Sequence, residues 1–277
     1  MPTLLVFGGT GFLGRRLVAG GLTRGFDVTA THHTTTPDVE ASGATWTRCD
    51  ITERQEVGSV VNDAQPDVVI NAAYVQRGPA SDVVCGTAAG WIAESAERAS
   101  AKLVHVSTDL VFDGELGRSY AEADAPAPLS GYGGAKLRGE QLVAAAAPTA
   151  VVARTSLIYG DPSGPQEKLT AQAIGSDKIA FFTDEWRSPV HVEDLAAALL
   201  DLSATTFAGI LHVAGSDRLN RFEFAKLLAT NNGNDPNQLV GKPQDPSLGP
   251  RPKDVSLNIE KALALGLNLP GARRHKR

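Results

Sequence analysis

The 277-residue sequence is poor in cysteine, with only Cys49 and Cys85. Two cysteines are too few for a disulfide framework, and their spacing matches no metal site. The sequence therefore favours a reducing compartment. It also lacks a basic N-terminal region, a signal-peptide cleavage site and any apolar run of about 18 or more residues. We therefore expect a cytoplasmic protein without a membrane span.

The sequence also lacks a strong excess of charge of one sign. Its formal net charge is -5, which gives no general attraction to nucleic acid or to anionic membranes. The basic stretch "ARRHKR" is too short to change this, and we interpret it as solvated. We expect a small-molecule partner and no binding of nucleic acid or membrane.

Strand-length apolar runs alternate with helical segments through about residue 155. The runs are "TLLVFG", "DVTAT", "ATWTRCD", "DVVINAA", "KLVHVST" and "AVVART". Because parallel strands need crossover helices, this alternation predicts an α/β fold with a Rossmann-type doubly wound parallel sheet. Stretches rich in proline, glycine and asparagine then break the rhythm and predict a smaller C-terminal lobe for substrate. We expect residues 1–160 and 187–215 in the Rossmann domain, and residues 161–186 and 216–277 in the lobe.

A glycine-rich turn, "VFGGTGFLGRRLV", follows the first expected strand and opens a helix. It places Gly8, Gly11 and Gly14 in a GxxGxxG arrangement. Glycine permits a tight turn and lets backbone amides approach a pyrophosphate, whose charge the helix N-terminus also favours. The strand, turn and helix together favour nucleotide binding over a purely structural turn.

The second expected strand ends in histidine where an acidic residue would favour NAD. His32 occupies the acid's place, His33 follows, and Arg15 and Arg16 lie just past the glycines. A 2′-phosphate would therefore meet no anion, which favours NADP(H). If these are only surface residues, either NADP(H) or NAD(H) can bind. In "CDIT", Asp50 suits either the adenine amino group or the N-cap of the next helix.

A tyrosine and a lysine, Tyr132 and Lys136, stand four residues apart in "GYGGAKLRGEQLV". Positions i and i+4 share a helix face. The lysine cation can therefore stabilise a phenolate whose unperturbed pKa is about 10. Upstream, Thr108 ends a strand in "VHVSTDLVFDG", where open α/β sheets place their ligands, and it can offer a hydroxyl to a substrate carbonyl. Alternatively, its hydroxyl bonds only to nearby backbone.

The ordered motifs "GGTGFLG", "CDIT", "NAA", "STDLVFDG", "YGGAK" and "RTSLIYG" resemble the extended short-chain dehydrogenase/reductase superfamily. Within it, "STDLVFDG", "DEWRSPVHVEDLA" and "RPKDVSLN" most resemble the dTDP-4-dehydrorhamnose reductase branch, which also includes the methionine adenosyltransferase beta subunit. The resemblance covers roughly residues 3 to 265 and allows a homodimer, because relatives are often dimers.

This resemblance implies a catalytic triad of Thr108, Tyr132 and Lys136, with Tyr132 as the proton donor in reduction. It implies an NAD(P)H-dependent ketoreductase acting on a nucleotide-linked sugar or a similarly polar ketone. A nucleotide-sugar epimerase and a non-catalytic, NADP-binding regulatory subunit are the alternatives. The implied cofactor contacts, taken with the two histidines above, are Gly8, Thr10, Gly11, Phe12, Leu13, Gly14, His32, His33, Asp50, Ile51, Ala72, Ala73, Tyr74, Tyr132 and Lys136.

The sequence departs from the family pattern at several positions. Leu157 replaces an aromatic residue near the sugar, the segment after "NAA" is several residues shorter, and Cys85 stands where an asparagine usually supports a proton-relay water. A thiol is a weaker hydrogen-bonding group, although Cys85 also suits a buried apolar position. The dehydratase glutamate position is Leu110, which cannot act as a base, so a 4,6-dehydratase is not expected.

Arginines in "EWRSPVH" and "GPRPKD" suit a phosphate or carboxylate, and surface salt bridges explain them about as well. His191 and His212 flank apolar residues and are expected to be structural. The spacing of histidine, aspartate and glutamate predicts no metal site. The residues expected to contact substrate are Thr108, Asp109, Leu157, Arg187 and Arg251.

Overall fold

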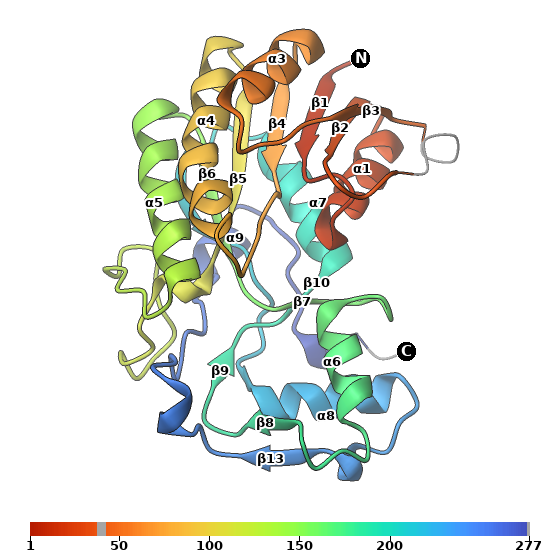
Figure 1. The fold of residues 1–277 in the computed structure, drawn as a ribbon, viewed down its shortest axis with the longest axis vertical. Helices are drawn as coiled ribbons and strands as arrows, with labels where there is room; N and C mark the ends of the chain where they lie inside the picture. The colour runs from red at the N-terminus through yellow and green to blue at the C-terminus, as the bar shows by residue number, and fades with distance from the viewer. Residues whose placement is uncertain (38–42, 276–277) are drawn as a thin grey trace. The chain divides into compact units, whose positions relative to one another are not determined.

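A seven-stranded sheet forms the centre of the fold in the computed structural model, which describes residues 1–37 and 43–275 (Figure 1). The strand order is β3-β2-β1-β4-β5-β6-β11, and β1 pairs in parallel with both β2 and β4. This order reverses direction beside β1, as in doubly wound dinucleotide-binding sheets. The strands are β1 Thr3–Phe7, β2 Asp27–His32, β3 Thr45–Arg48, β4 Val68–Asn71, β5 Lys102–Thr108, β6 Val151–Thr155 and β11 Gly209–His212.

Helices cover both faces of this sheet (Figure 1). They are α1 Phe12–Thr23, α3 Arg54–Ala64, the π-helical turn η1 Val83–Thr87, α4 Ala88–Arg98, α5 Gly131–Ala146 and α7 Val192–Ser203. Helices α3, α4 and α5 pack on one face, and α1 lies on the other. Among the described residues, no helix is long and apolar enough to cross a membrane. The predicted Rossmann-type sheet is confirmed.

The apolar run of β1 explains why it lies at the centre of the sheet. Side chains alternate between faces along a strand. Leu5 and Phe7 therefore join the core under α3 to α5, while Leu4 touches the α1 side at Gly21. Leu4, Leu5 and Phe7 are all at most 1% exposed. A strand covered on both faces reads as a continuous apolar run, as this one does.

The chain divides into two compact units, each built from separate stretches. The first contains residues 1–108, 131–153 and 196–211, and the second contains residues 109–130, 154–195 and 212–277. The expected division differs, because it left residues 109–130, 154–160, 187–195 and 212–215 in the first unit. Those residues instead join the second unit, where Tyr120 forms a β-bridge with Leu257.

The second unit contains small two-stranded sheets and short helices. Helix α8 begins with a capping box, in which its N-cap Asn220 accepts from the Glu223 amide. The elements are η2 Asp109–Val111, β7 Ile158–Tyr159, α6 Pro165–Ala173, β8 Ala180–Phe182, β9 Trp186–Arg187, β10 Val190–His191, β12 Leu219–Asn220, α8 Arg221–Asn231, η3 Pro236–Gln238, β13 Val240–Lys242, η4 Pro246–Leu248, α9 Glu260–Ala264 and η5 Ala272–Arg274.

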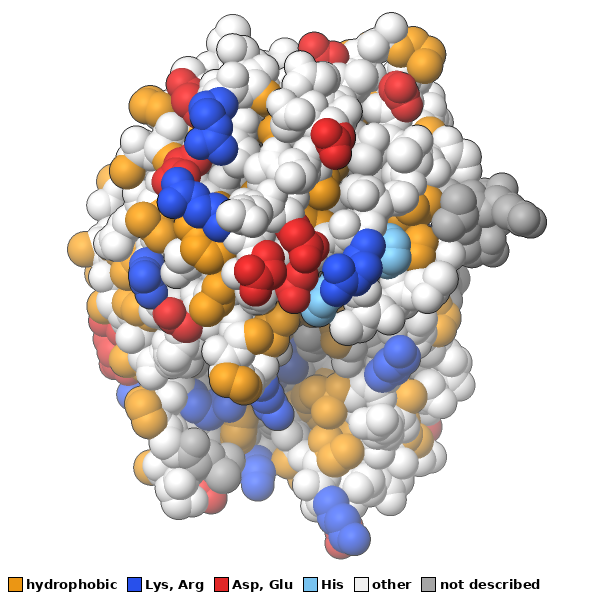
Figure 2. All heavy atoms as spheres, turned by 45° about the horizontal axis from the view of Figure 1, so that its top comes forward, with side chains coloured by type: hydrophobic (Ala, Val, Ile, Leu, Met, Phe, Trp, Pro, Cys, Tyr) orange, Lys and Arg blue, Asp and Glu red, His pale blue; other side chains and the backbone are white. Residues whose placement is uncertain are grey.

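Charged side chains of both signs are interspersed on the face drawn in Figure 2. Acidic and basic groups lie close together there, with apolar side chains scattered between them. This mixture agrees with the small net charge of -5. On this face, a polyanion would meet carboxylates as well as cations.

Candidate active site

The glycine-rich turn between β1 and α1 has no room for side chains at two of its motif positions. Gly8 has a φ of +79°, and a Cβ there would lie 2.9 Å from the backbone of Ala73. A Cβ on Gly14 would lie only 2.0 Å from the Gly8 carbonyl oxygen. The Gly11 amide donates to the same oxygen at 3.0 Å. Glycine is thus required where α1 meets the end of β1.

The N-terminus of α1 is suited to bind an anion. Its N-cap is Gly11, no side chain of the described residues caps it, and its first turn contains no acidic residue. The amides of the first turn of a helix have no acceptor within the helix, and the helix dipole favours negative charge there. The turn therefore fits a dinucleotide pyrophosphate. Thr10 and Phe12 are partly exposed around it, and Leu13 is buried.

The end of β2 presents two histidines beside Asp50. His33 Nε2 lies 3.4 Å from Asp50 Oδ2, and its side chain is 49% exposed. His32 Nδ1 is buried without a hydrogen-bond partner among the described residues. β2 thus ends in histidine where an acid would select NAD, and the carboxylate beside His33 is that of Asp50.

Asp50 is held in the turn before α3. Its carboxylate accepts from the Thr52 hydroxyl at 2.7 Å and from the Thr52 amide at 3.0 Å. These bonds, followed by the charges of His33 and Arg48, lower the pKa of Asp50. The N-cap of α3 is Glu53, so the helix-cap alternative for Asp50 is wrong, because the helix begins later than expected.

Beyond β4, the chain runs through Ala72, Ala73 and Tyr74. Asn71, the last residue of β4, accepts from the Ala73 amide at 3.2 Å, which fixes the orientation of its amide group. Its nitrogen therefore faces His105 Nδ1 at 3.1 Å. Tyr74 is 53% exposed. The backbone of Ala73 therefore lies beside Gly8, so the end of β4 adjoins the glycine-rich turn.

The three expected catalytic residues lie on β5 and α5. Thr108 is the last residue of β5, and Tyr132 and Lys136 occupy the first turns of α5. Lys136 is 2% exposed, and its ammonium donates to the carbonyl of Val106 at 2.9 Å. Burial lowers the pKa of Lys136, while Cys85 and Glu140 act in the opposite direction. The lysine is therefore anchored to the same strand that ends in Thr108.

Two buried polar contacts beneath this site were not predicted. Ser107 donates to Glu140 at 2.5 Å, and His105 is tied to Asn71. Burial, and then the charge of Lys136, lower the pKa of His105 well below its ordinary value, so it is neutral. The sequence held one signal, because Glu140 continues the i, i+4 series of Tyr132 and Lys136.

Cys85 lies in η1, the π-helical turn before α4. It is fully buried, its thiol donates to the carbonyl of Val75 at 3.4 Å, and Tyr132 packs against its apolar cluster. A Cβ on Gly139 of α5 would lie 2.4 Å from the Cys85 carbonyl oxygen. Small residues thus let η1 and α5 approach closely. The structure places Cys85 as a buried packing residue.

In the second unit, the expected substrate arginines form ion pairs. Arg187 is 6% exposed and lies 2.7 Å from Asp109 and 3.3 Å from Glu185. Arg251 lies 2.9 Å from Glu185, with a side chain 43% exposed. Leu157 is partly buried beside the cluster around Tyr159. Asp109 also accepts from a serine hydroxyl, so its carboxylate is held from two sides.

The sequence matches the model of a known family along nearly its whole length. The family is described as RmlD substrate binding domain, and the match spans residues 2–275. The chain belongs to this family. The extended short-chain dehydrogenase/reductase branch predicted from the motifs is therefore confirmed.

Named relatives of this family are mostly sugar reductases. A dTDP-4-dehydrorhamnose reductase of Mycolicibacterium smegmatis is 33% identical, covering 95% of this chain and 80% of that protein. Methionine adenosyltransferase 2 subunit beta of Mus musculus is 28% identical, covering 95% and 82%. The crystal structure of dTDP-4-dehydrorhamnose reductase from Bacillus anthracis in complex with NADP matches with a TM-score of 0.83 and 25% identity, covering 99% of this chain and 97% of that one.

Proposed function

We propose that this protein is an NADP(H)-dependent reductase of a keto group on a nucleotide-linked sugar. The observation that carries the proposal is the buried Lys136, anchored to the strand that ends in Thr108 and placed one helical turn after Tyr132. The names of the relatives supply the substrate class, since several are dTDP-sugar reductases.

The first unit would hold the cofactor through its glycine-rich turn. The turn from Gly8 to Gly14 and the α1 N-terminus would bind the pyrophosphate. His32 and His33 would face the adenosine ribose and its phosphate, with Asp50 and Ile51 toward the adenine. When bound, NADPH supplies the hydride.

The chain itself supplies the proton. Thr108 would donate its hydroxyl hydrogen bond to the carbonyl oxygen, and the Tyr132 phenol would transfer its proton to that oxygen as it gains charge. A neighbouring cation lowers the pKa of a phenol, and Lys136 provides this cation from one turn away. The Glu140 charge favours the ammonium form of Lys136.

We propose that fewer residues of the second unit contact the substrate than the sequence suggested. Arg251 is partly exposed and would have to leave Glu185 to reach a phosphate, whereas Arg187 is buried between two carboxylates. Asp109 would then support the substrate side by orienting Arg187. Leu157 would offer the sugar an apolar contact but no aromatic ring on which to stack. We further propose that the enzyme works in the cytoplasm as a homodimer.

A reductase assay tests the central claim. Purified protein with NADPH should oxidise the cofactor in the presence of a dTDP-4-keto-6-deoxy sugar. Tyr132→Phe should lower kcat by about 10²- to 10⁴-fold, the usual contribution of a positioned acid. Its NADPH affinity should remain, as measured by fluorescence titration. Wild type and Tyr132→Phe that both bind NADPH and are equally inert on a panel of keto-sugar nucleotides would refute the proposal.

One relative supports a second candidate, a non-catalytic regulatory subunit. The mouse protein that is 28% identical is named as the beta subunit of a methionine adenosyltransferase. Such a role would give NADPH binding without turnover, together with stable association with a partner enzyme. Pull-down from the native host, followed by the reductase assay on the isolated protein, separates the two candidates.

A further inference from the structure

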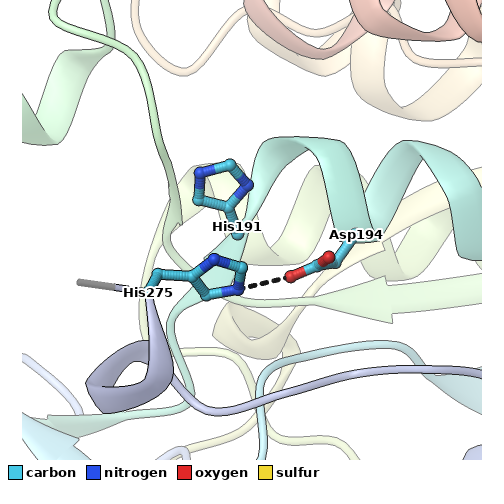
Figure 3. Close-up of side chains that lie close together, drawn as sticks. All are labelled: His191, Asp194 and His275. Carbon is cyan, nitrogen blue, oxygen red and sulfur yellow. Dashed lines mark hydrogen bonds and ion pairs between the residues drawn. The ribbon is translucent and has the colours of Figure 1, made fainter. Parts of the chain in front are cut away.

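Two histidines and an aspartate come together in the second unit. Figure 3 shows His191, Asp194 and His275 gathered where α7 begins. Each offers one ligand atom, and these atoms all lie within 4.8 Å of one another. His275 Nε2 is 2.6 Å from Asp194 Oδ2. The sequence predicted no metal site because the third residue lies 81 positions beyond Asp194.

Local structure holds these side chains in place. His191 is the last residue of β10, and Asp194 lies three residues later in the first turn of α7. The His275 ring stacks on His191 with ring centroids 4.3 Å apart and an interplanar angle of 12°. A Cβ on Gly160 would lie 2.3 Å from His191 Nε2, so glycine there makes room for the ring.

A small polar cavity adjoins the cluster. Its volume is about 110 Å³, and its lining includes Tyr159, Glu167, His191 and His275. The Tyr159 hydroxyl and Glu167 Oε2 are buried atoms without hydrogen-bond partners among the described residues, on side chains 2% and 5% exposed. At roughly 30 Å³ per water, the cavity has room for a few waters to complete a coordination shell and to satisfy these atoms.

We propose that His191, Asp194 and His275 bind a divalent transition-metal ion, with Zn²⁺ as the best fit. Two imidazole nitrogens and one carboxylate form a donor set that zinc accepts, whereas Mg²⁺ prefers oxygen ligands alone. The fourth position faces the cavity. This site is separate from the reductase chemistry proposed above.

The geometry defines what must move on binding. Tetrahedral ligands about 2.0 to 2.2 Å from zinc lie roughly 3.3 Å from one another. The His275 to Asp194 contact of 2.6 Å must therefore open, with the metal replacing the hydrogen-bonding proton between them. One of the stacked rings must also turn about its Cβ–Cγ bond, since parallel lone pairs do not converge. The ion would then link the segment carrying His275 to the start of α7.

Metal titration of the full-length protein tests the proposal. Tag-free protein is stripped with a chelator and titrated with Zn²⁺ and with Co²⁺, whose visible absorption reports low-coordinate nitrogen and oxygen ligation. We expect one equivalent to bind and the melting temperature to rise with Zn²⁺. His275→Ala, near the chain end, should weaken zinc binding by more than tenfold and abolish the cobalt spectrum. Asp194→Asn should weaken binding similarly.

Glu193→Gln is the matched control, because it removes an exposed carboxylate adjacent in sequence without removing a proposed ligand. It should bind zinc as the wild type does, and circular dichroism should show all variants folded. Equal zinc affinity in the wild type and in His275→Ala overturns the proposal. So does displacement of cobalt by equimolar Mg²⁺, which would indicate an oxygen-only site.

Discussion

At the scale of single residues, the buried carboxylate of Glu185 and the arginines around it keep one another charged. Burial alone would raise the pKa of Glu185, but the charges of Arg187, Arg221 and Arg251 outweigh it and hold the pKa below its usual range. Burial lowers the pKa of Arg221 to about 10. Glu185, Arg187 and Arg221 have lost most of their water, so each depends on its partners.

Replacing Arg187 should therefore unfold the protein more readily than replacing Arg251. Arg187→Met leaves Asp109 without its buried cation and should lower the free energy of unfolding by about 3 kcal/mol. Arg251→Met removes a 43% exposed side chain and should cost less than about 1 kcal/mol. Urea unfolding measures both. If Arg187→Met keeps its stability but raises KM, Arg187 binds substrate instead of supporting the fold.

The sequence left the role of these arginines open for a physical reason. Glu185 stands two residues before Arg187, so one ion pair was visible as a local pattern. The stronger contact is with Asp109, 78 residues away, and depends on tertiary folding. The contact between His275 and Asp194 likewise joins residues that are distant in the sequence and depends on tertiary folding.

At the scale of elements, α5 combines an open position with a tightly packed one. Apart from its two chain neighbours and the backbone of its own helix, no atom of the described residues lies within 4 Å of a Cβ placed on Gly134, whereas a Cβ on Gly139 would collide with the Cys85 carbonyl. Packing within the protein therefore explains Gly139 and does not explain Gly134. The glycine beside Tyr132 and Lys136 fits the cofactor role proposed for this face.

Alanine at these two positions should have opposite effects on stability. Gly134→Ala should raise the free energy of unfolding of the cofactor-free protein by up to about 1 kcal/mol, since alanine favours helix. It should also weaken NADPH binding. Gly139→Ala should lower stability by about 1 to 3 kcal/mol through overpacking. Thermal unfolding with and without NADPH measures both. Equal stabilisation by the two changes would contradict the close contact of α5 with η1.

The sequence predicted this helix and its reactive face, but not its neighbour η1. Tyr132 and Lys136 share a helix face because they are four residues apart, and this spacing is visible in the sequence. A π-turn depends instead on what packs against it, here Gly139 and Ala135 of α5. Cys85 and the shortened segment after "NAA" were the signs that this region departs from the family pattern.

At the scale of the whole molecule, two buried histidines make stability depend on pH. His212 is fully buried, and burial lowers its pKa to about 4 from an ordinary 6.5. Burial also lowers the pKa of His105. Below about pH 6.5 these two histidines become protonated in the unfolded chain but stay neutral in the folded chain. Stability from the neutral histidines is therefore present above pH 6.5 and is lost as the pH falls toward 4.

His212→Gln should flatten this dependence. The free energy of unfolding of the wild type should fall between pH 6.5 and 4 by up to about 1.4 kcal/mol per pH unit for each histidine, and the variant should lose one histidine's share. Urea unfolding at several pH values provides the measurement. His33→Gln, at a half-exposed side chain, is the control. An unchanged slope in His212→Gln would show that His212 is not responsible.

Most of the sheet was predictable, whereas the division into units was not. Apolar runs and crossover helices determine a parallel, doubly wound sheet almost by themselves. The assignment of residues 109–130 depends on partners such as Leu257, more than a hundred positions away. The periodicity of a sequence does not report such pairings.

The interleaving of the two units also affects how the chain is synthesised and folds. The chain leaves the first unit after residue 108 and returns to it finally at residue 196, ahead of β11. A ribosome therefore cannot release a finished first unit before starting the second. The two units therefore cannot fold one after the other during translation. Its sheet is completed only when β11, the neighbour of β6, has emerged, so a nascent chain exposes an unpaired β6 edge until then.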